Sequence, residues 1–305
     1  MAALLNLGTS RRCEVGDLII DADPLYVAAR RVLLDALFAL APHGKAVIVV
    51  GAQAIYLRTG DAELAIAPYT SDGDLALNPS LLSDSPLLDR AMRDANFTLM
   101  RQPEGHEEPG VWVASTLVNG TEELIPIDLI VPRAVTLSGG RRGARLGAHG
   151  NITARSTVGL EAALIDHSPI VVGALDPDDL RTIGVEVAGM AALLIAKAHK
   201  IRDRVESRRE SRISDKDAAD VVRIMQNTDP LEIATRMSTL LVDPVASDST
   251  HDAVSHLENL FGRRGQAGIE MAQRALQLAL SPDTVEVICT TYVNILTQSI
   301  TELGG

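Results

Sequence analysis

The spacing of apolar residues predicts a short helix, a strand and a second helix near the start of the chain. Residues 24–41 repeat apolar positions at helical spacing, with Pro24 in the first turn. Residues 46–51, AVIVVG, form a β-branched run without alternation, which is typical of a strand covered on both faces. The run ends at Gly51, and AQAIYLRTG after it predicts a helix that closes at Gly60.

Shorter apolar runs follow, and most of them predict strands. TSDGDLAL predicts a strand, residues 84–97 predict a helix, and strands are expected over 97–102, 111–118 and 119–132. Residues 138–150 are rich in glycine and arginine, so we expect a mobile loop there.

The pattern becomes helical from about residue 188. Helices are expected in GMAALLIAKAHKIRDRVESRRE, in ISDKDAADVVRIMQ, and over 229–242, 251–262, 266–280 and 282–302. The expected fold class is therefore α+β (mixed α/β), with a sheet-and-helix core over residues 1–185 and a helical domain over 186–305.

Composition and charge restrict the partners. Apolar residues make up 46% of the chain and aromatic residues 3%, so the core must be aliphatic. The net charge of −12 repels nucleic acid overall, and any such contact needs a local basic patch. Cys13 and Cys289 form no CxxC pair, which fits a reducing cytoplasm. No apolar stretch has the length of a membrane span or the pattern of a signal peptide, so we expect a cytoplasmic protein without a membrane partner.

Three aspartates form the first candidate site. Asp72 and Asp74 are two residues apart in the expected strand TSDGDLAL, so their side chains would share one face. Asp128 lies in a second expected strand, IPIDLIV, where a lone carboxylate would be unfavourable. Three carboxylates from two strands predict a site for Mg²⁺ or Mn²⁺. The alternative is that the DxD pair is only a turn or a helix cap.

Two further features suit a nucleotide. Gly51, between a strand and a helix, lets backbone amides approach a phosphate, although it also fits a tight turn without a ligand. Lys197, Lys200 and Arg204 share one helix face, where a lysine would neutralise triphosphate oxygens or simply extend into solvent. Asp217 and Asp220, three residues apart on the next helix, would pair with Lys197 or Arg204, either within a site or as an ordinary salt bridge between helices.

Basic side chains gather at two places. Arg141, Arg142 and Arg145 lie on the glycine-rich segment, and a second group that includes Lys200 surrounds the end of the long helix. These are the places where an acidic protein would hold an RNA backbone. Acidic residues are interspersed, so the second group also fits a solvated surface.

Four segments in order resemble the AbiEii/MenT group of nucleotidyltransferases, within the DNA polymerase β-type superfamily. VVGAQA is similar to the strand–Gly–Gly–helix motif of that group, and TSDGDLAL is similar to its T-x-D-x-D strand. AKAHKIRDR resembles its helix with a lysine and an arginine seven residues later, and KDAADVVRIM resembles its RDxxDL motif. The matches span roughly residues 46–226. Ala52 stands in place of the second glycine, and Lys216 in place of the arginine of RDxxDL.

The resemblance implies a role for each matching residue. Asp72 and Asp74 would bind the catalytic metal, and Asp128 matches the third carboxylate of the superfamily, the base that activates the acceptor hydroxyl. Asp217 would complete the catalytic site. The implied nucleotide-binding residues are Gly51, Ala52, Thr70, Ser71, Lys197 and Arg204.

The resemblance also implies an activity. Such a protein would be an enzyme that moves NMP from an NTP to an acceptor hydroxyl, with release of pyrophosphate. The expected acceptor is the 3′ end of tRNA, and the expected role is the toxin of a toxin–antitoxin system, with an antitoxin as partner. The alternatives are a small-molecule or protein hydroxyl as acceptor, or a nucleotide-binding module without catalytic activity.

Overall fold

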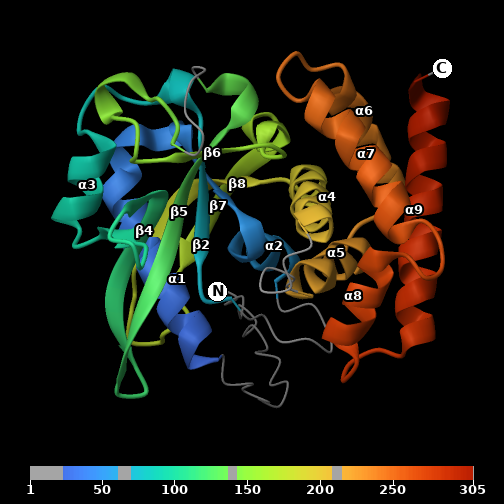
Figure 1. The fold of residues 1–305 in the computed structure, drawn as a ribbon, viewed down its shortest axis with the longest axis horizontal. Helices are drawn as coiled ribbons and strands as arrows, with labels where there is room; N and C mark the ends of the chain where they lie inside the picture. Colours follow the sequence, from blue (N-terminus) through green and yellow to red (C-terminus); the bar gives the residue numbers. More distant parts are fainter. Residues whose placement is uncertain (1–22, 61–69, 137–142, 208–214, 305) are drawn as a thin grey trace, which may run out of the picture.

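The computed structural model describes residues 23–60, 70–136, 143–207 and 215–304. Its strands form a mixed sheet, and the last helices gather beside that sheet (Figure 1). This arrangement confirms the mixed α+β class. In the described residues the strand order is β3-β4-β5-β2-β1-β8-β7, with β6 paired to β5. The strands are β1 (Val47–Val50), β2 (Gly73–Leu77), β3 (Thr98–Arg101), β4 (Glu107–Val118), β5 (Thr121–Pro132), β6 (Arg155–Thr157), β7 (His167–Gly173) and β8 (Thr182–Ala188).

Each of the helices expected from the apolar spacing is present. Helix α3 begins later than expected, because a proline disfavours helical backbone at the residue before it, Ser85, and Leu87 is extended. No helix within the described ranges is long and apolar enough to cross a membrane. The helices are α1 (Pro24–Leu40), α2 (Gly51–Thr59), α3 (Leu88–Asp94), α4 (Met190–Ser207), α5 (Lys216–Gln226), α6 (Pro230–Leu241), α7 (Ser247–Phe261), α8 (Ala267–Leu276) and α9 (Pro282–Gly304).

The two faces of the sheet differ in what covers them. Helix α1 packs on β2, β4, β5 and β8, and α2 packs on β1, β2 and α4. A Cβ atom added to Gly73 would lie 3.2 Å from Cδ1 of Leu33, so Gly73 faces α1. Successive residues of a strand point to opposite faces, and Asp74 therefore faces away from α1. Asp128 is the register partner of Asp74 on β5 and shares that face.

The strands after residue 150 were not expected from the sequence. Strands β7 and β8 pair in antiparallel fashion, and His167 Nδ1 lies 2.8 Å from Glu186 Oε2 across that pair. Strand β8 continues to Ala188, beyond the expected end of the core at residue 185. The first helix of the expected helical domain, α4, contacts α2 as well as α5 and α7, so the helical half packs directly on the sheet half.

The glycine-rich segment differs from the mobile loop that its composition predicted. Its first residues lie outside the described ranges, but three of residues 143–150 have buried side chains. Ala144 and Leu146 are buried, and the Ala144 amide donates to the Ala154 carbonyl at 2.8 Å. The two apolar side chains alternate with polar ones, and their burial holds this part of the segment against the sheet.

Candidate functional site

The site begins where β1 meets α2. Gly51 starts α2 with φ +69°, a backbone conformation that favours glycine. A Cβ atom at this position would lie 2.0 Å from Asp74 Oδ2, so the absent side chain makes room for that carboxylate. No side chain caps the start of α2, and Ala52 follows in its first turn. The turn therefore places a carboxylate beside backbone amides that lack a side-chain cap.

Asp72 lies just before β2, and not inside the strand as expected, because the strand begins at Gly73. Its position is set by local contacts. The hydroxyl of the buried Thr70 donates to Asp72 Oδ1, and Gln53 Nε2 donates to the Asp72 carbonyl at 3.4 Å. Ser71, between these two residues, is partly exposed. These contacts hold Asp72 immediately before β2, two residues from Asp74.

Burial, followed by repulsion between carboxylates, dominates the electrostatics here. Burial, and then the Asp72 carboxylate, raise the pKa of Asp74, while Lys200, Arg155 and Lys197 act in the opposite direction. Burial, and then the Asp74 carboxylate, raise the pKa of Asp128 to about 7. Arg155 opposes that rise by donating from Nη2 to Asp128 Oδ2. The three aspartates are therefore close enough to repel one another electrostatically, and a bound cation would relieve that repulsion.

The aspartates do not form a three-ligand metal group in this structure. Within the described parts of the chain, no group of three or more His, Cys, Asp or Glu side chains is arranged to hold a metal ion. Asp128 is instead paired with Arg155. Mg²⁺ usually takes one or two carboxylates and completes its shell with waters and substrate phosphates. Asp72 and Asp74 fit that role, and their oxygen donors suit Mg²⁺ or Mn²⁺.

A compact network of charges joins α4 to α5. Lys197 Nζ donates to Asp217 Oδ1 and to Asp220 Oδ2, each at 2.6 Å. Burial alone would lower the pKa of Lys197, but the Asp220 and Asp217 carboxylates raise it above its ordinary value. Lys200 and Arg204 also pair with Asp217, whose pKa is held well below its usual range by the three cations, against the effect of burial. Lys197 is therefore fully protonated.

Exposure separates the cations of this network. The side chains of Lys197 and Asp217 are each 5% exposed, whereas that of Lys200 is 43% exposed. Lys200 pairs with Asp217 but is accessible from the cleft, while the buried ammonium of Lys197 has two carboxylate partners. Lys197 still lines the cleft beside Asp74, but Asp217 lies behind it and does not.

A cleft of about 860 Å³ opens between the sheet and α4. Gly51, Asp74 and Arg155 line its sheet side, and Lys197, Lys200 and Arg204 line its α4 side, as their shared helix face predicted. Basic residues outnumber acidic ones along its walls, in contrast to the whole chain. The remaining lining residues are Val50, Ile130, Arg133, Thr157, Val158, Leu160, Leu193, Ala196, His199, Arg202, Asp203, Glu206 and His256.

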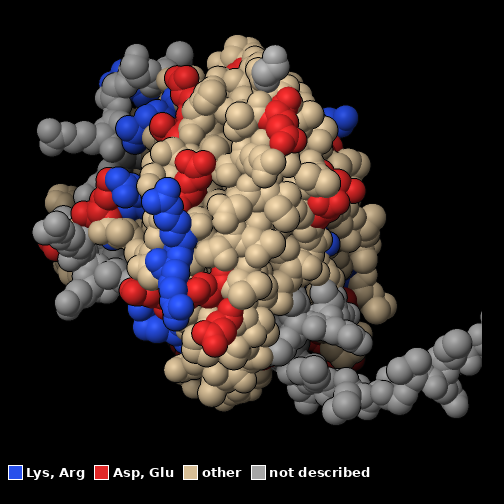
Figure 2. Space-filling model, turned by 90° about the vertical axis from the view of Figure 1, so that its right-hand side faces the viewer, with Lys and Arg blue, Asp and Glu red and all other residues tan. Residues whose placement is uncertain are grey.

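The structure describes two of the four expected RNA-binding residues, Arg145 and Lys200. Arg141 and Arg142 lie outside the described residues, and Arg145 is exposed but does not line the cleft. Of the four, Lys200 lines it. On the outer face of the C-terminal helices, the described Lys and Arg side chains form a narrow band bordered by acidic groups, and much of the surface is uncharged (Figure 2). This face therefore carries no broad basic patch among its described residues.

Two arginines and two histidines of the cleft were not identified as site residues from the sequence. Arg133 follows β5, and Arg155 starts the three-residue strand β6, which is too short to leave an apolar pattern. His199 and His256 meet edge to face, with ring centroids 5.0 Å apart, and His199 Nε2 lies 2.7 Å from the Ser249 carbonyl. No sequence signal pairs α4 with α7, so only the packing of these helices shows that the histidines share the cleft.

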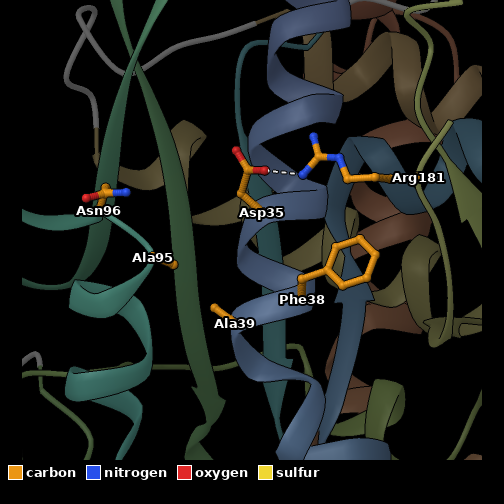
Figure 3. Close-up of a pocket in the computed structure, with 6 residues that line it drawn as sticks. All are labelled: Asp35, Phe38, Ala39, Ala95, Asn96 and Arg181. Atoms are coloured by element: carbon orange, nitrogen blue, oxygen red, sulfur yellow. Dashed lines mark hydrogen bonds and ion pairs between the residues drawn. The ribbon is translucent and has the colours of Figure 1, made fainter. Parts of the chain in front are cut away.

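A second hollow of about 540 Å³ is lined by residues of α1, by the turn after α3 and by Arg181 (Figure 3). Its charged residues are Asp35 and Arg181, which pair with each other at 2.5 Å. The other lining residues are Phe38, Ala39, Ala95 and Asn96. This hollow shares no residue with the cleft, and its two charges already neutralise each other.

No protein-family model and no curated protein sequence matches the chain. The geometry of the cleft is therefore the basis for the assignment that follows.

Proposed function

We propose that the chain is a nucleotidyltransferase that moves NMP from an NTP to an acceptor hydroxyl. The observation that supports this most directly is the close approach of Asp74 to Gly51 at the sheet end of a basic cleft. Asp72 does not line the cleft, but its carboxylate is near enough to raise the pKa of Asp74. Carboxylates bind the metal that accompanies a triphosphate, and the cations of the cleft walls neutralise its phosphate oxygens. The cleft contains both a carboxylate, Asp74, and the basic side chains of its walls.

Each group of residues has a distinct task in this proposal. Asp72 and Asp74 would hold Mg²⁺, which neutralises charge on the transferring phosphoryl group. Thr70 orients Asp72, and the first turn of α2 offers backbone amides to the phosphates. Lys200 and Arg204 line the opposite wall, and Lys197 keeps a permanent positive charge at its base. Catalysis would come from positioning and charge neutralisation.

The acceptor is proposed on different grounds. The four ordered motifs resemble nucleotidyltransferases that modify tRNA 3′ ends, and the basic cleft suits an RNA backbone better than the acidic remainder of the chain does. We therefore propose tRNA as acceptor and a toxin, controlled by an antitoxin, as the biological role. The toxin role is supported by the resemblance alone.

A label-transfer assay tests the proposal. Purified protein is incubated with Mg²⁺, total tRNA and each α-labelled NTP in turn, and we expect one NTP to label tRNA. Asp74→Asn should reduce the labelling rate by roughly a hundredfold or more, because it removes a metal ligand. Asp89→Asn, the same change on the exposed surface of α3, serves as the matched control and should label like the wild type.

The outcomes separate the alternatives. Asp74-dependent release of pyrophosphate without labelled RNA would point to a small-molecule or protein hydroxyl as acceptor. Equal labelling by Asp74→Asn and Asp89→Asn would contradict the assigned site. Absence of turnover, with nucleotide binding retained, would leave a nucleotide-binding module.

A further inference from the structure

Arg155 has a fixed backbone at the edge of the cleft. It starts β6, pairs with Ile130 of β5 in parallel register, and forms a bridge with Gly143 on its other side. A Cβ atom added to Gly110 would lie 2.3 Å from the Arg155 backbone nitrogen, so the chain is closely packed at this point. Any rearrangement of Arg155 must therefore occur in its side chain.

The side chain reaches the same face as the candidate metal ligands. Ile130 is two residues beyond Asp128, so Arg155, its register partner, emerges on the face that holds Asp128 and Asp74. Arg155 Nη2 donates to Asp128 Oδ2, and the Arg155 side chain is 39% exposed against 18% for Asp128. Arg155 also lines the cleft with Gly51 and Asp74. It therefore stands between a carboxylate and the space proposed for the nucleotide.

The contacts of Arg155 are incomplete. Its Nε is buried and has no hydrogen-bond partner among the described residues. A buried N–H without a partner is unfavourable, and a guanidinium binds best when two of its donors face one carboxylate or phosphate group. A phosphate in the cleft would offer several oxygen acceptors to the same fork of donors. Asp128 would at the same time lose its cationic partner and become available to a metal ion.

We propose that Arg155 is a phosphate-binding residue that exchanges partners, pairing with Asp128 in the free protein and with a nucleotide phosphate in the complex. Asp128 joins Asp72 and Asp74 only after that exchange. This inference rests on the proposed function. It explains why three aspartates that interact electrostatically do not form a three-ligand group in the free protein.

Two binding measurements test the exchange on Arg155→Gln. Mn²⁺ binding without nucleotide is followed by the electron paramagnetic resonance signal of free Mn²⁺. Each of the four NTPs is titrated calorimetrically at saturating Ca²⁺. Loss of a charge-assisted contact should weaken the preferred NTP by about tenfold or more. Mn²⁺ should bind more tightly than to the wild type, because Arg155 no longer competes for Asp128.

Two further variants serve as controls. Arg133→Gln removes another positive charge from the cleft but leaves the Asp128 pair intact, so it should not strengthen Mn²⁺ binding. Arg155→Lys keeps the charge without the fork, and it should retain wild-type Mn²⁺ binding while losing part of the NTP affinity. Thermal unfolding of each variant confirms that it is folded.

The proposal is supported if Arg155→Gln binds Mn²⁺ more tightly and the preferred NTP more weakly than the wild type does, while Arg133→Gln does not show both changes. Unchanged or weaker Mn²⁺ binding, or an NTP loss no larger than that of Arg133→Gln, would overturn it while leaving the nucleotidyltransferase proposal in place. A wild-type protein that binds neither Mn²⁺ nor any NTP would overturn both.

Discussion

At the scale of single residues, Gly51 is a position of the candidate site with little freedom to change. It combines a positive φ with an approach to Asp74 that leaves no room for a side chain. The two requirements have different consequences. A side chain at this positive φ would lower the stability of the fold, and the Cβ atom would displace the Asp74 carboxylate. The two effects can be measured separately, because Gly44 also has a positive φ but has no atom near an added Cβ.

Gly51→Ala should therefore lose both stability and activity. The strained backbone should lower the free energy of unfolding by about 1–3 kcal/mol. The added methyl group should displace the Asp74 carboxylate and reduce nucleotidyl transfer well beyond the effect of lost stability. Gly44→Ala is the matched control, because Gly44 has φ +52° and an added Cβ there meets nothing within 4 Å. Denaturant unfolding and transfer rates measure both quantities, and equal loss of activity in the two variants would contradict the argument.

At the scale of elements, α4 and α5 are joined through buried charges. Lys197 on α4 pairs with Asp217 and Asp220 on α5, and Asp220 also accepts from the Tyr56 hydroxyl of α2 at 3.2 Å. Arg223 of α5 lies over the Tyr56 ring, with 4.9 Å to its centroid. This network locks three helices together and sets the orientation of the α4 face that lines the cleft.

Removal of Lys197 should destabilise the protein strongly. Lys197→Met leaves two buried carboxylates without their shared cation, which costs about 3–5 kcal/mol in comparable buried pairs. The matched control Lys45→Met removes an exposed lysine and should change stability by less than about 0.5 kcal/mol. Denaturant unfolding measures both. A small effect in Lys197→Met would show that the pair is well solvated.

At the scale of the whole molecule, the distribution of charge matters more than its sum. The chain has a net charge of −12, yet cations outnumber acids along the cleft. Long-range repulsion therefore disfavours nonspecific contact with nucleic acid, while the excess of cations makes the cleft locally favourable for an anionic group. The same buried charges that shape the cleft also make the stability of the fold depend on pH.

The free energy of unfolding should depend on pH in the acidic range. The pKa of Asp217 is lowered in the folded protein, so its contribution to stability is complete above the unfolded pKa, about 4, and is lost as pH falls below it. The free energy of unfolding should therefore fall more steeply below about pH 4 in the wild type than in Asp217→Asn. Asp94→Asn, which removes an exposed carboxylate, should keep the wild-type slope. Identical slopes in all three proteins would contradict the assignment.

Much of the architecture was predictable because local patterns dominate it. Apolar spacing predicted α1, β1, α2 and the C-terminal helices, and the shared face of Lys197, Lys200 and Arg204 followed from helical periodicity alone. Strands β7 and β8 were not predicted. Apolar and other residues alternate over 182–188, but small and exposed residues interrupt the apolar pattern of both strands. The placement of Asp72 inside a strand was wrong, since its contacts with Thr70 and Gln53 hold it outside the ladder.

The sequence by itself determined the helices, the strands before residue 135, the acidic net charge, Gly51 at a strand–turn–helix junction, and the Asp72 and Asp74 pair at the start of the next strand. Tertiary structure alone decided which charges meet. It paired Asp128 with Arg155 and enclosed Lys197 between two carboxylates, and it brought α7 to the cleft. The physical reason is the sequence separation of the residues involved. Helix and strand periodicity depends on neighbours a few residues apart, whereas ion pairs and cleft walls join distant residues that only sheet register and helix packing bring together.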